Sequence, residues 1–540
     1  MQTQVIIVGA GPVGLTLALD LGYRGIRCVL IEQKNEPAFL PKMERCNART
    51  MEMFRRIGLA DQIRAAGLPA ECVMDVFIAL SLTQPPILHL KYPSVAEARR
   101  RIAASCDGAQ PLEPYQLISQ YTLEPLLKAA AERVPCITVR YGTEFLEFAQ
   151  DESAVTATVR HADGATETIR SAYLVGCDGG SSLIRRQLNI RLRGEGNIAR
   201  FRQGLYRCDE LYDRLPLAGG PGRGRHYLVA DEYASFLIMQ DSRRHWTMHA
   251  AVESDDEMRT RFEEVVGVPV RYEMLYCGEW RQNLLLADSY GVGRVFLAGD
   301  AVHLMIPTGG LGMNTGVGDA IDLSWKLAAT LQGWGGPHLL RSYQVERRQV
   351  GERNIGASRY AALGYRKWRS GCGPELRDNT AAGHAARERL AQLANVEQRK
   401  VNEMIGAELG YRYVDSPLIA NIPGGPEHRY REYCPTTWPG ARLPHVWSPE
   451  GRAIQDRIPT TGFTLLRLNS LHDLAGLRSA FAAYQVPLTE LDIEAEPARA
   501  VYERDLLLLR PDLHVVWRGN EPPQDPMELA AVATGYHPGL

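Results

Sequence analysis

The first apolar run of the chain, residues 5–8, leads directly into a glycine-rich turn. An apolar run without polar alternation is typical of a strand that is buried on both faces of a parallel sheet. After the turn, residues 15–19 begin a helical apolar pattern, and a second apolar run over 28–31 ends at Glu32. This order predicts a strand, a helix and a second parallel strand.

Two later apolar runs end in motifs that combine glycine and aspartate. Residues 173–176 precede Asp178-Gly179, and residues 294–298 precede Gly299-Asp300. Both runs predict buried strands, and the apolar spacing over 316–331 predicts a helix after the second motif.

The rest of the chain changes its pattern twice. Between about 183 and 282, short apolar runs such as 234–239 and 246–252 alternate with turns and predict a β-rich insertion. From about 340 to 410 the pattern is helical and charged, and a proline-rich segment at 435–445 follows. The elements expected here are helices at 341–359 and 385–409, a loop at 371–383, strands at 463–468, 506–509 and 513–517, and a helix at 473–484.

Composition narrows the class of protein. A chain of 540 residues, 45% hydrophobic and 23% charged, is long enough for about three folded domains. The 61 Lys+Arg and 63 Asp+Glu residues give a net charge of −2, which argues against a general nucleic-acid binder. No apolar stretch approaches the roughly 20 residues of a membrane span, and no leader-like segment precedes the first strand, so we expect no membrane segment.

The ten cysteines are widely spaced, and no two form a C-x-x-C pair. This spacing gives no local support for a zinc site or a dithiol redox pair, so we expect no bound metal. Unpaired thiols indicate a reducing compartment, and the expected location is the cytoplasm.

The turn after the first strand reads Gly9-Ala10-Gly11-Pro12-Val13-Gly14, which is the spacing G-x-G-x-x-G. In a β-α-β unit Gly9 permits the tight turn, Gly11 lets the backbone approach a pyrophosphate, and Gly14 allows close packing of helix on strand. The helix N-terminus presents free N–H groups to the phosphates. Glu32 can accept from both ribose hydroxyls and would repel a 2′-phosphate. These features predict a site for FAD or NAD, with Pro12 and Val13 in the cofactor loop.

The glycine turn, the Asp-Gly segment at Asp178, the Gly-Asp segment at Asp300 and their order together resemble the class A flavoprotein monooxygenases. These are aromatic hydroxylases of the para-hydroxybenzoate hydroxylase fold, and the resemblance extends over most of the chain. It implies that FAD is bound, that Asp300 contacts the ribityl chain, and that Asp178 supports both the FAD site and a transient NADPH site. Arg45 and Gln120 match family positions that contact FAD.

In this family a glycine-rich stretch after the Gly-Asp motif begins a helix aimed at the flavin ring. The resemblance therefore implies that backbone N–H groups of Gly310, Gly312, Met313 and Asn314 lie beside the isoalloxazine. A helix N-terminus there would stabilise negative charge on the reduced flavin. Pro307 matches the family proline whose carbonyl lies near the flavin.

The implied fold class is α/β: a Rossmann-type FAD/NAD(P)-binding fold with an inserted β-sheet substrate domain and a C-terminal thioredoxin-like domain. That last domain lacks C-x-x-C, so dithiol exchange cannot operate in it. The expected divisions are an FAD-binding domain at 1–75, 105–182 and 283–365, a substrate-binding β-sheet domain at 76–104 and 183–282, a helical connector at 366–424, and the thioredoxin-like domain at 425–540.

The activity implied by the resemblance is that of an FAD-dependent monooxygenase. It would use NADPH or NADH and O2 to hydroxylate a phenolic or related aromatic substrate through a C4a-hydroperoxyflavin. Removing the phenol proton would make the ring a better nucleophile, so a general base would help. His226 and Tyr227, which follow a glycine-rich turn, are the first candidates, ahead of His249, Tyr276 and Arg223. For each of these side chains, packing in a strand or surface exposure is the simpler interpretation.

Alternatives stay open at this point. A flavoenzyme of the same fold could catalyse a Baeyer–Villiger oxidation or a dehydrogenation, and a flavin-binding module could lack catalysis altogether. The identity of the aromatic substrate, the choice between NADH and NADPH, and a monomer or homodimer are not decided by these patterns.

Overall fold

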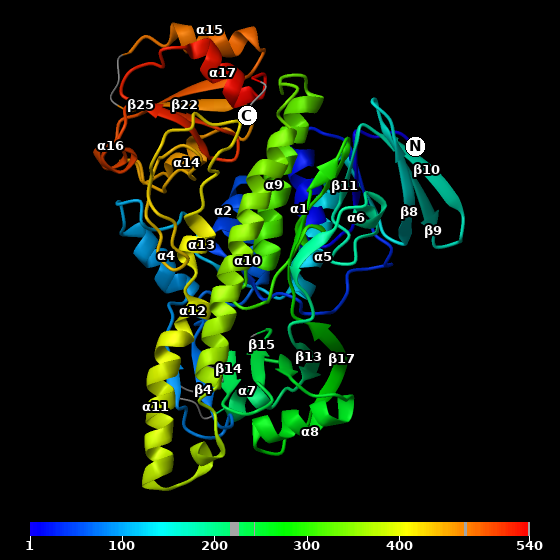
Figure 1. Cartoon of the computed structure of the whole chain (residues 1–540), viewed down its shortest axis with the longest axis vertical. Coiled ribbons are helices and arrows are strands. Elements are labelled where there is room, and N and C mark those ends of the chain that lie inside the picture. The colour runs from blue at the N-terminus through cyan, green and yellow to red at the C-terminus, as the bar shows by residue number, and fades with distance from the viewer. Residues whose placement is uncertain (216–225, 242, 469–471, 538–540) are drawn as a thin grey trace.

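The structure is a computed structural model that describes residues 1–215, 226–241, 243–468 and 472–537. Figure 1 shows a central α/β layer with a β-sheet unit at one end of the molecule and the C-terminal α/β unit at the other. The long helix α10 (Arg341–Arg369) runs from the central layer toward the β-sheet unit.

The central sheet follows the predicted apolar runs. It is built from β1 (Val5–Val8), β2 (Cys28–Ile31), β7 (Ile137–Arg140), β11 (Tyr173–Gly176), β19 (Gly291–Val292) and β20 (Val295–Leu297). Its order is β19-β20-β11-β1-β2-β7, and all pairs except β19–β20 are parallel. Every residue of β1 is buried, as an unbroken apolar run requires in a covered parallel sheet. The predicted β-α-β unit is confirmed.

Helices cover the central sheet. They are α1 (Pro12–Tyr23), α2 (Ala48–Arg56), α3 (Ala60–Ala66), α5 (Gln120–Glu132), α6 (Leu183–Gln187) and α9 (Gly312–Leu331). α1 packs against both α5 and α9. A small antiparallel sheet of β8 (Thr143–Gln150), β9 (Val155–His161) and β10 (Thr166–Ser171) lies beside this layer (Figure 1).

A seven-stranded sheet forms the unit at the other end of α10, in the order β17-β13-β16-β15-β14-β4-β5. Its strands are β4 (Val76–Ala79), β5 (Leu88–Leu90), β13 (Arg200–Arg207), β14 (His226–Val229), β15 (Phe236–Met239), β16 (His245–Ala250) and β17 (Glu273–Arg281). One face packs on α8 (Asp255–Val266). The outer strands β4 and β5 come from a much earlier part of the chain, and β4 joins β14 in parallel.

Short elements link the layers. They are β3 (Arg45–Cys46) paired with β6 (Gln116–Leu117), β12 (Leu192–Glu195) paired with β18 (Leu284–Ala287), β21 (His303–Leu304), α4 (Val95–Ala103) and α7 (Leu211–Arg214). α10 is longer than the predicted helix because its last turns pack on the seven-stranded sheet, where Trp368 is fully buried. The helix expected at 385–409 is divided into α11 (Ala381–Glu397), α12 (Arg399–Asn402) and α13 (Ile405–Leu409).

The C-terminal unit has the strand order β23-β22-β24-β25. It comprises β22 (Phe463–Leu468), α15 (Ala475–Ala483), β23 (Leu488–Ile493), α16 (Glu496–Tyr502), β24 (Leu506–Leu509), β25 (Val515–Gly519) and α17 (Pro526–Thr534), after a short α14 (Ile454–Arg457). β22 and β23 are parallel, whereas β24 is antiparallel to β22 and β25. This order and direction agree with a thioredoxin-like arrangement. Trp325 of α9 lies in the same apolar cluster as Phe463, so this unit packs on α9.

Candidate active site

The loops after four parallel strands meet at one edge of the central sheet, which we call the carboxyl edge. Parallel strands place their carboxyl ends together, and ligands of open α/β sheets bind there. Gly9 follows β1 with φ +103°, and a Cβ on it would lie 2.3 Å from the carbonyl oxygen of Cys177. A Cβ on Gly14 would lie 2.0 Å from the carbonyl oxygen of Gly9. Both glycines are therefore required by the fold of the turn itself.

Gly11 differs from the other two glycines because the space beside it is open. The nearest atom to a Cβ built there is Glu124 Oε1, at 4.0 Å. Gly11 is the N-cap of α1, and Pro12 follows it in the first turn. Free helix N–H groups and an uncrowded backbone fit a pyrophosphate. Glu32 lies against the same turn, where its Oε2 accepts a hydrogen bond from the Ala10 N–H at 3.0 Å.

The two aspartates of the later motifs flank this turn. Asp178 Oδ2 accepts hydrogen bonds from Leu183 N at 2.8 Å and Ile184 N at 3.2 Å, which caps α6. Its Oδ1 is buried and has no hydrogen-bond partner within the described residues, so it is available to a bound group. The Asp300 side chain is reached by solvent, yet the protein around it raises the pKa of the carboxyl. Both carboxyls fit a polar ligand at the carboxyl edge.

The side chain of Val13 packs inward, between Gly299 and Gly316. A Cβ on Gly299 would lie 3.0 Å from Val13 Cγ2, and a Cβ on Gly316 would lie 2.6 Å from the same atom. These contacts bring α1, α9 and the loop of Asp300 together. Val13 therefore shapes the site through packing.

The N-terminus of α9 is held by the side chains of Arg45 and Asn314. Asn314 Oδ1 accepts from Asn47 N at 2.9 Å, and Asn314 Nδ2 donates to Gly310 O at 2.7 Å. Arg45 donates to Gly309 O at 3.2 Å and lies 3.4 Å from Glu408 Oε1. Sequence reasoning did not identify Glu408.

Several positions around this helix end are open. No atom lies within 4 Å of a Cβ built on Gly312, and Pro307 and Gly310 are exposed. Met313 is half-buried in the first turn of α9. The first N–H groups of a helix have no partner inside it, so this end can stabilise negative charge on a bound ring.

Gln120 begins α5 and lies near the same loops, because its backbone N–H donates to Met43 O at 3.1 Å. Its Nε2 donates to Glu124 Oε1 at 2.6 Å. Burial raises the pKa of Glu124. The spacing of Gln120 and Glu124, four positions apart on one helix face, was the signal that could have identified this second residue.

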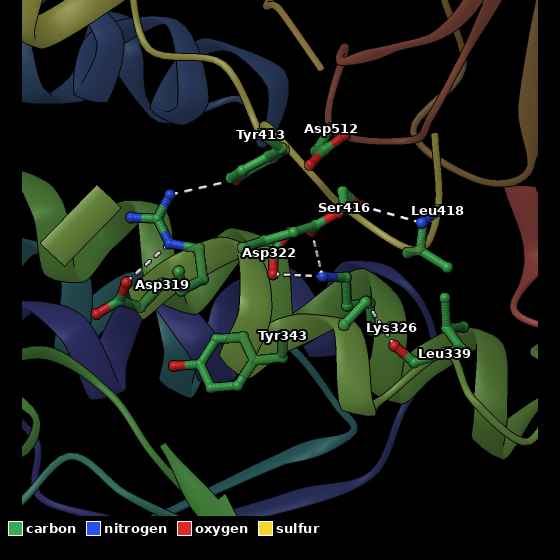
Figure 2. A network of polar contacts seen from close by, with 12 residues as sticks. Asp319, Asp322, Lys326, Leu339, Tyr343, Tyr413, Ser416, Leu418 and Asp512 are labelled. Carbon is green, nitrogen blue, oxygen red and sulfur yellow. Dashed lines mark hydrogen bonds and ion pairs between the residues drawn. The ribbon is translucent and has the colours of Figure 1, made fainter. Parts of the chain in front are cut away.

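Behind the site, α9 and α10 are joined by buried ion pairs (Figure 2). Lys326 Nζ donates to Asp322 Oδ2 at 2.7 Å and to Glu346 Oε2 at 2.6 Å. Arg510 of the C-terminal unit donates to the same two carboxylates, at 2.9 Å and 2.5 Å. The C-terminal unit is therefore tied to the helix that begins at Gly312.

The seven-stranded sheet meets the loop that precedes β3 through His226. Its Nε2 lies 2.6 Å from Oε1 of Glu44, which directly precedes β3. His249, on the same face of the sheet, stacks on Phe236 at 4.5 Å and accepts a hydrogen bond from Trp280 Nε1 at 3.0 Å. The surrounding protein lowers the pKa of His249 to about 3, so the ring is neutral near neutral pH.

Tyr227 lies on the opposite face of β14. Successive side chains of a strand alternate between faces, and Tyr227 is 1% exposed in the core that includes Phe262 of α8. It stacks on Phe77 at 5.8 Å. Tyr227 therefore lies on the face opposite to that of His226, and its nomination as a general base stays a prediction. Tyr276 is 37% exposed on β17, and Arg223 lies outside the described residues.

Residues 2–358 match the model described as FAD binding domain, and residues 436–536 match the model described as aromatic-ring hydroxylase, C-terminal. The chain belongs to the FAD-dependent aromatic-ring hydroxylases. It is an FAD-dependent monooxygenase, and the predicted family and cofactor are confirmed.

Relatives of this monooxygenase match it over nearly their full length. The FAD-dependent monooxygenase apdD of Emericella nidulans is 32% identical, with 98% of this chain and 90% of the relative covered. Phenol 2-monooxygenase of a Pseudomonas species is 28% identical, with 97% and 91% covered. Among solved structures, the rebeccamycin biosynthetic enzyme RebC with reduced flavin has a TM-score of 0.90 at 31% identity, with 99% of both chains covered. The monooxygenase PieE in complex with FAD and substrate has a TM-score of 0.87 at 29% identity, with 99% and 98% covered.

Other kinds of site receive no support from the described part of this monooxygenase. Within it, no group of three or more His, Cys, Asp or Glu side chains is arranged to hold a metal ion. No helix there has the length and apolar character that crossing a bilayer demands. Burial raises the pKa of Cys28 and Cys46 to about 12, so neither thiol forms a nucleophilic thiolate near neutral pH.

Proposed function

We propose that this monooxygenase hydroxylates a phenolic or related aromatic ring held between the N-terminus of α9 and the face of the seven-stranded sheet that carries His226. Relatives named as phenol 2-monooxygenase, 4-methyl-5-nitrocatechol 5-monooxygenase and aklavinone 12-hydroxylase support a substrate of this class. The contact of Glu44 with His226 supports the location, because it joins a flavin-site loop to the sheet. In this proposal the sheet is the substrate-binding domain.

The FAD site that we propose follows the carboxyl edge. The pyrophosphate lies on the turn of Gly9, Gly11 and Gly14 and on the N-terminus of α1, and Glu32 accepts from the adenosine ribose. When bound, FAD would accept electrons from NADPH or NADH and would activate O2.

The remaining cofactor contacts follow from the two aspartates and from α9. Asp300 and the free oxygen of Asp178 accept hydrogen bonds from the cofactor, and the first N–H groups of α9 face the flavin ring. Arg45 holds the loop of Gly309, and the backbone N–H of Gln120 holds the loop of Met43. In this proposal the Pro307 carbonyl lies beside the ring.

Glu44 and His226 together provide a proton acceptor for the substrate hydroxyl. When the His226 Nε2–H donates to Glu44, Nδ1 of the ring is left as the acceptor. Taking the phenol proton there raises the electron density of the ring at the carbon that is oxygenated. His249 stays neutral and, with Phe236 and Trp280, contributes an aromatic wall without adding charge.

The test is substrate-stimulated oxidation of NADPH or NADH by the FAD-loaded protein, with a panel of phenols under ¹⁸O2. We expect at least one phenol to accelerate oxidation and to yield a product that carries one ¹⁸O atom. Product formation without label would identify a dehydrogenase of the same fold. No acceleration by any phenol or polycyclic aromatic would contradict the proposed substrate class.

A further inference from the structure

A cavity of about 330 Å³ lies away from the flavin and substrate faces, at the junction of α10, the segment after α13 and the start of the C-terminal unit. Its walls include Val350 and Arg353 of α10, and Tyr411, Arg412 and His428 of the following segment. Neither the carboxyl edge nor the face of His226 contributes to these walls. A volume of this size is typical of a small-molecule site.

Arg353 brings a positive charge to this cavity without a carboxylate partner. Its guanidinium donates to the carbonyl oxygens of Gly406 at 2.9 Å and Ala407 at 3.0 Å, and to Asn354 Oδ1 at 2.9 Å. All of these acceptors are neutral, and no carboxylate in the described part of the chain lies within ion-pair distance. Burial lowers the pKa of Arg353 to about 9, which reflects this uncompensated charge.

Arg412 is the second cation of the cavity wall. Its side chain donates a hydrogen bond to Gly424 O at 3.3 Å, and the charge that acts on it is that of another cation, Arg518. Among the described residues it too has no carboxylate partner. Most of its guanidinium donors therefore remain free, and burial lowers its pKa.

His428 adds a neutral donor beside these two arginines. Its Nε2 accepts from Arg353 Nε at 2.6 Å, so the ring proton resides on Nδ1. Burial and the charge of Arg353 lower the pKa of His428 to about 4, which keeps the ring neutral near neutral pH.

Acidic side chains do not cancel this charge inside the cavity. Glu432 is 69% exposed and binds Arg429 at 2.7 Å, and Glu427 is exposed at the rim. Arg442, which also lines the cavity, is paired with buried Glu52. The positive charges of Arg353 and Arg412 therefore dominate the interior.

We propose that this cavity binds a small organic oxyanion, a carboxylate or a phosphate monoester, through Arg412 and His428. The guanidinium of Arg412 can donate to two oxygens of such a group, and His428 Nδ1–H provides a third hydrogen bond to it. Arg353 lies behind them as a fixed charge that favours the anion. The apolar walls at Val350 and Tyr411 accommodate the rest of the molecule.

The experiment is calorimetric titration of the FAD-loaded full chain with inorganic phosphate and, separately, with acetate, at constant ionic strength. Neither probe carries an aromatic ring, so the proposed substrate site is not titrated. We expect saturable binding of at least one probe, and the tighter probe identifies the phosphate or the carboxylate class. Arg412→Gln should weaken that binding by about tenfold or more, because a charge-assisted hydrogen bond is lost.

A second pair of variants keeps the test independent of Arg412. Val414 lines the cavity and is 48% exposed, so Val414→Glu places a repelling carboxylate at the wall without disturbing a core. Val345→Glu, at a 40% exposed position of α10 outside the cavity, is the matched control. We expect Val414→Glu to abolish binding and Val345→Glu to leave it unchanged. No saturable binding by the unaltered protein would overturn the proposal, and so would Arg412→Gln and Val414→Glu variants that both bind the probe as tightly as the unaltered protein does.

Discussion

Asp319 of α9 and Arg347 of α10 form a fully buried ion pair, with Arg347 Nε 2.8 Å from Asp319 Oδ1 (Figure 2). The second oxygen of the carboxylate accepts from Gly299 N at 3.0 Å and lies 2.9 Å from His303 Nε2. One carboxylate thus connects α10 to the loop that presents Asp300. The position of that loop depends on a charge that is never in contact with solvent.

Replacing Asp319 by Asn should therefore damage stability and FAD binding together. The variant leaves Arg347 buried without its counter-ion, and breaking such a pair costs about 3–5 kcal/mol of unfolding free energy. Asp288→Asn removes an exposed pair with Arg193 and should cost less than about 1 kcal/mol. Urea unfolding and FAD titration of both variants measure the difference. Equal unfolding free energies for the two variants would contradict the prediction.

Arg510 should hold the C-terminal unit on the monooxygenase core. Arg510→Met removes the cation that contacts Asp322, Glu346 and Asp512, so excess negative charge remains buried. We expect a loss of about 3–5 kcal/mol and proteolytic release of the C-terminal unit. Arg467→Met, at a half-buried site of β22 facing Asp492, is the control and should resist proteolysis as the parent does. Resistance of both variants would show that apolar packing alone holds the unit.

Alanine variants of two glycines test two different roles. Gly14→Ala tests the packing of the dinucleotide turn, and Gly312→Ala tests contact with the flavin. A methyl group on Gly14 meets a carbonyl oxygen at 2.0 Å, so Gly14→Ala should lower stability even without FAD. Gly312→Ala meets no atom within 4 Å, so the FAD-free protein should unfold as the parent does. If the flavin ring lies at the N-terminus of α9, Gly312→Ala should nevertheless weaken FAD binding by about tenfold. Fluorescence titration with FAD decides this, and unchanged affinity would place the ring elsewhere.

Glu44 should matter for turnover and Tyr227 should not. Glu44→Gln removes the carboxylate that orients His226, and we expect kcat to fall about 100-fold, with reduction of FAD by NADPH or NADH unaffected. Tyr227→Phe keeps the buried ring on the opposite face and should retain turnover. Glu36→Gln, at an exposed position, controls for the loss of one carboxylate. A pH profile of kcat that is identical in Glu44→Gln and the parent would rule out this role for Glu44.

The sequence was informative where local pattern and fold are directly linked. An unbroken apolar run of four residues is typical of a strand buried on both faces of a parallel sheet, and parallel strands place their carboxyl ends at one edge, as β1, β2, β11 and β20 do. Contacts between distant segments leave no such local signal. Glu44 meets His226 across 182 positions, and Arg510 meets Glu346 across 164.

The sequence also could not predict which side chains of β14 point toward the core. Residues 226–229 read His-Tyr-Leu-Val, a pattern in which apolar character does not alternate, so it could not show which side chain faces the core. The pairing with β4, from a distant segment, and the packing of α8 decide it. His226 and Tyr227 were therefore nominated together although the strand places them on opposite faces.

Acid should destabilise this monooxygenase through His445. The ring is 3% exposed, packs edge-on against Trp447 at 4.4 Å, and neither ring nitrogen has a hydrogen-bond partner in the described residues. Burial lowers the pKa of His445 to about 4, below its ordinary value of 6.5. Between these two pH values the unfolded chain binds a proton that the folded chain does not, so the unfolding free energy falls as pH falls.

His445→Phe removes this titration and keeps an aromatic ring against Trp447. Between pH 6 and 4.5 the variant should lose less unfolding free energy than the parent, by up to about 1.4 kcal/mol per pH unit. His384→Phe, at an exposed position of α11, controls for the loss of one histidine. Urea unfolding across this pH range measures the slopes. If His445→Phe and His384→Phe change the slope equally, burial of His445 is not the source of the acid sensitivity.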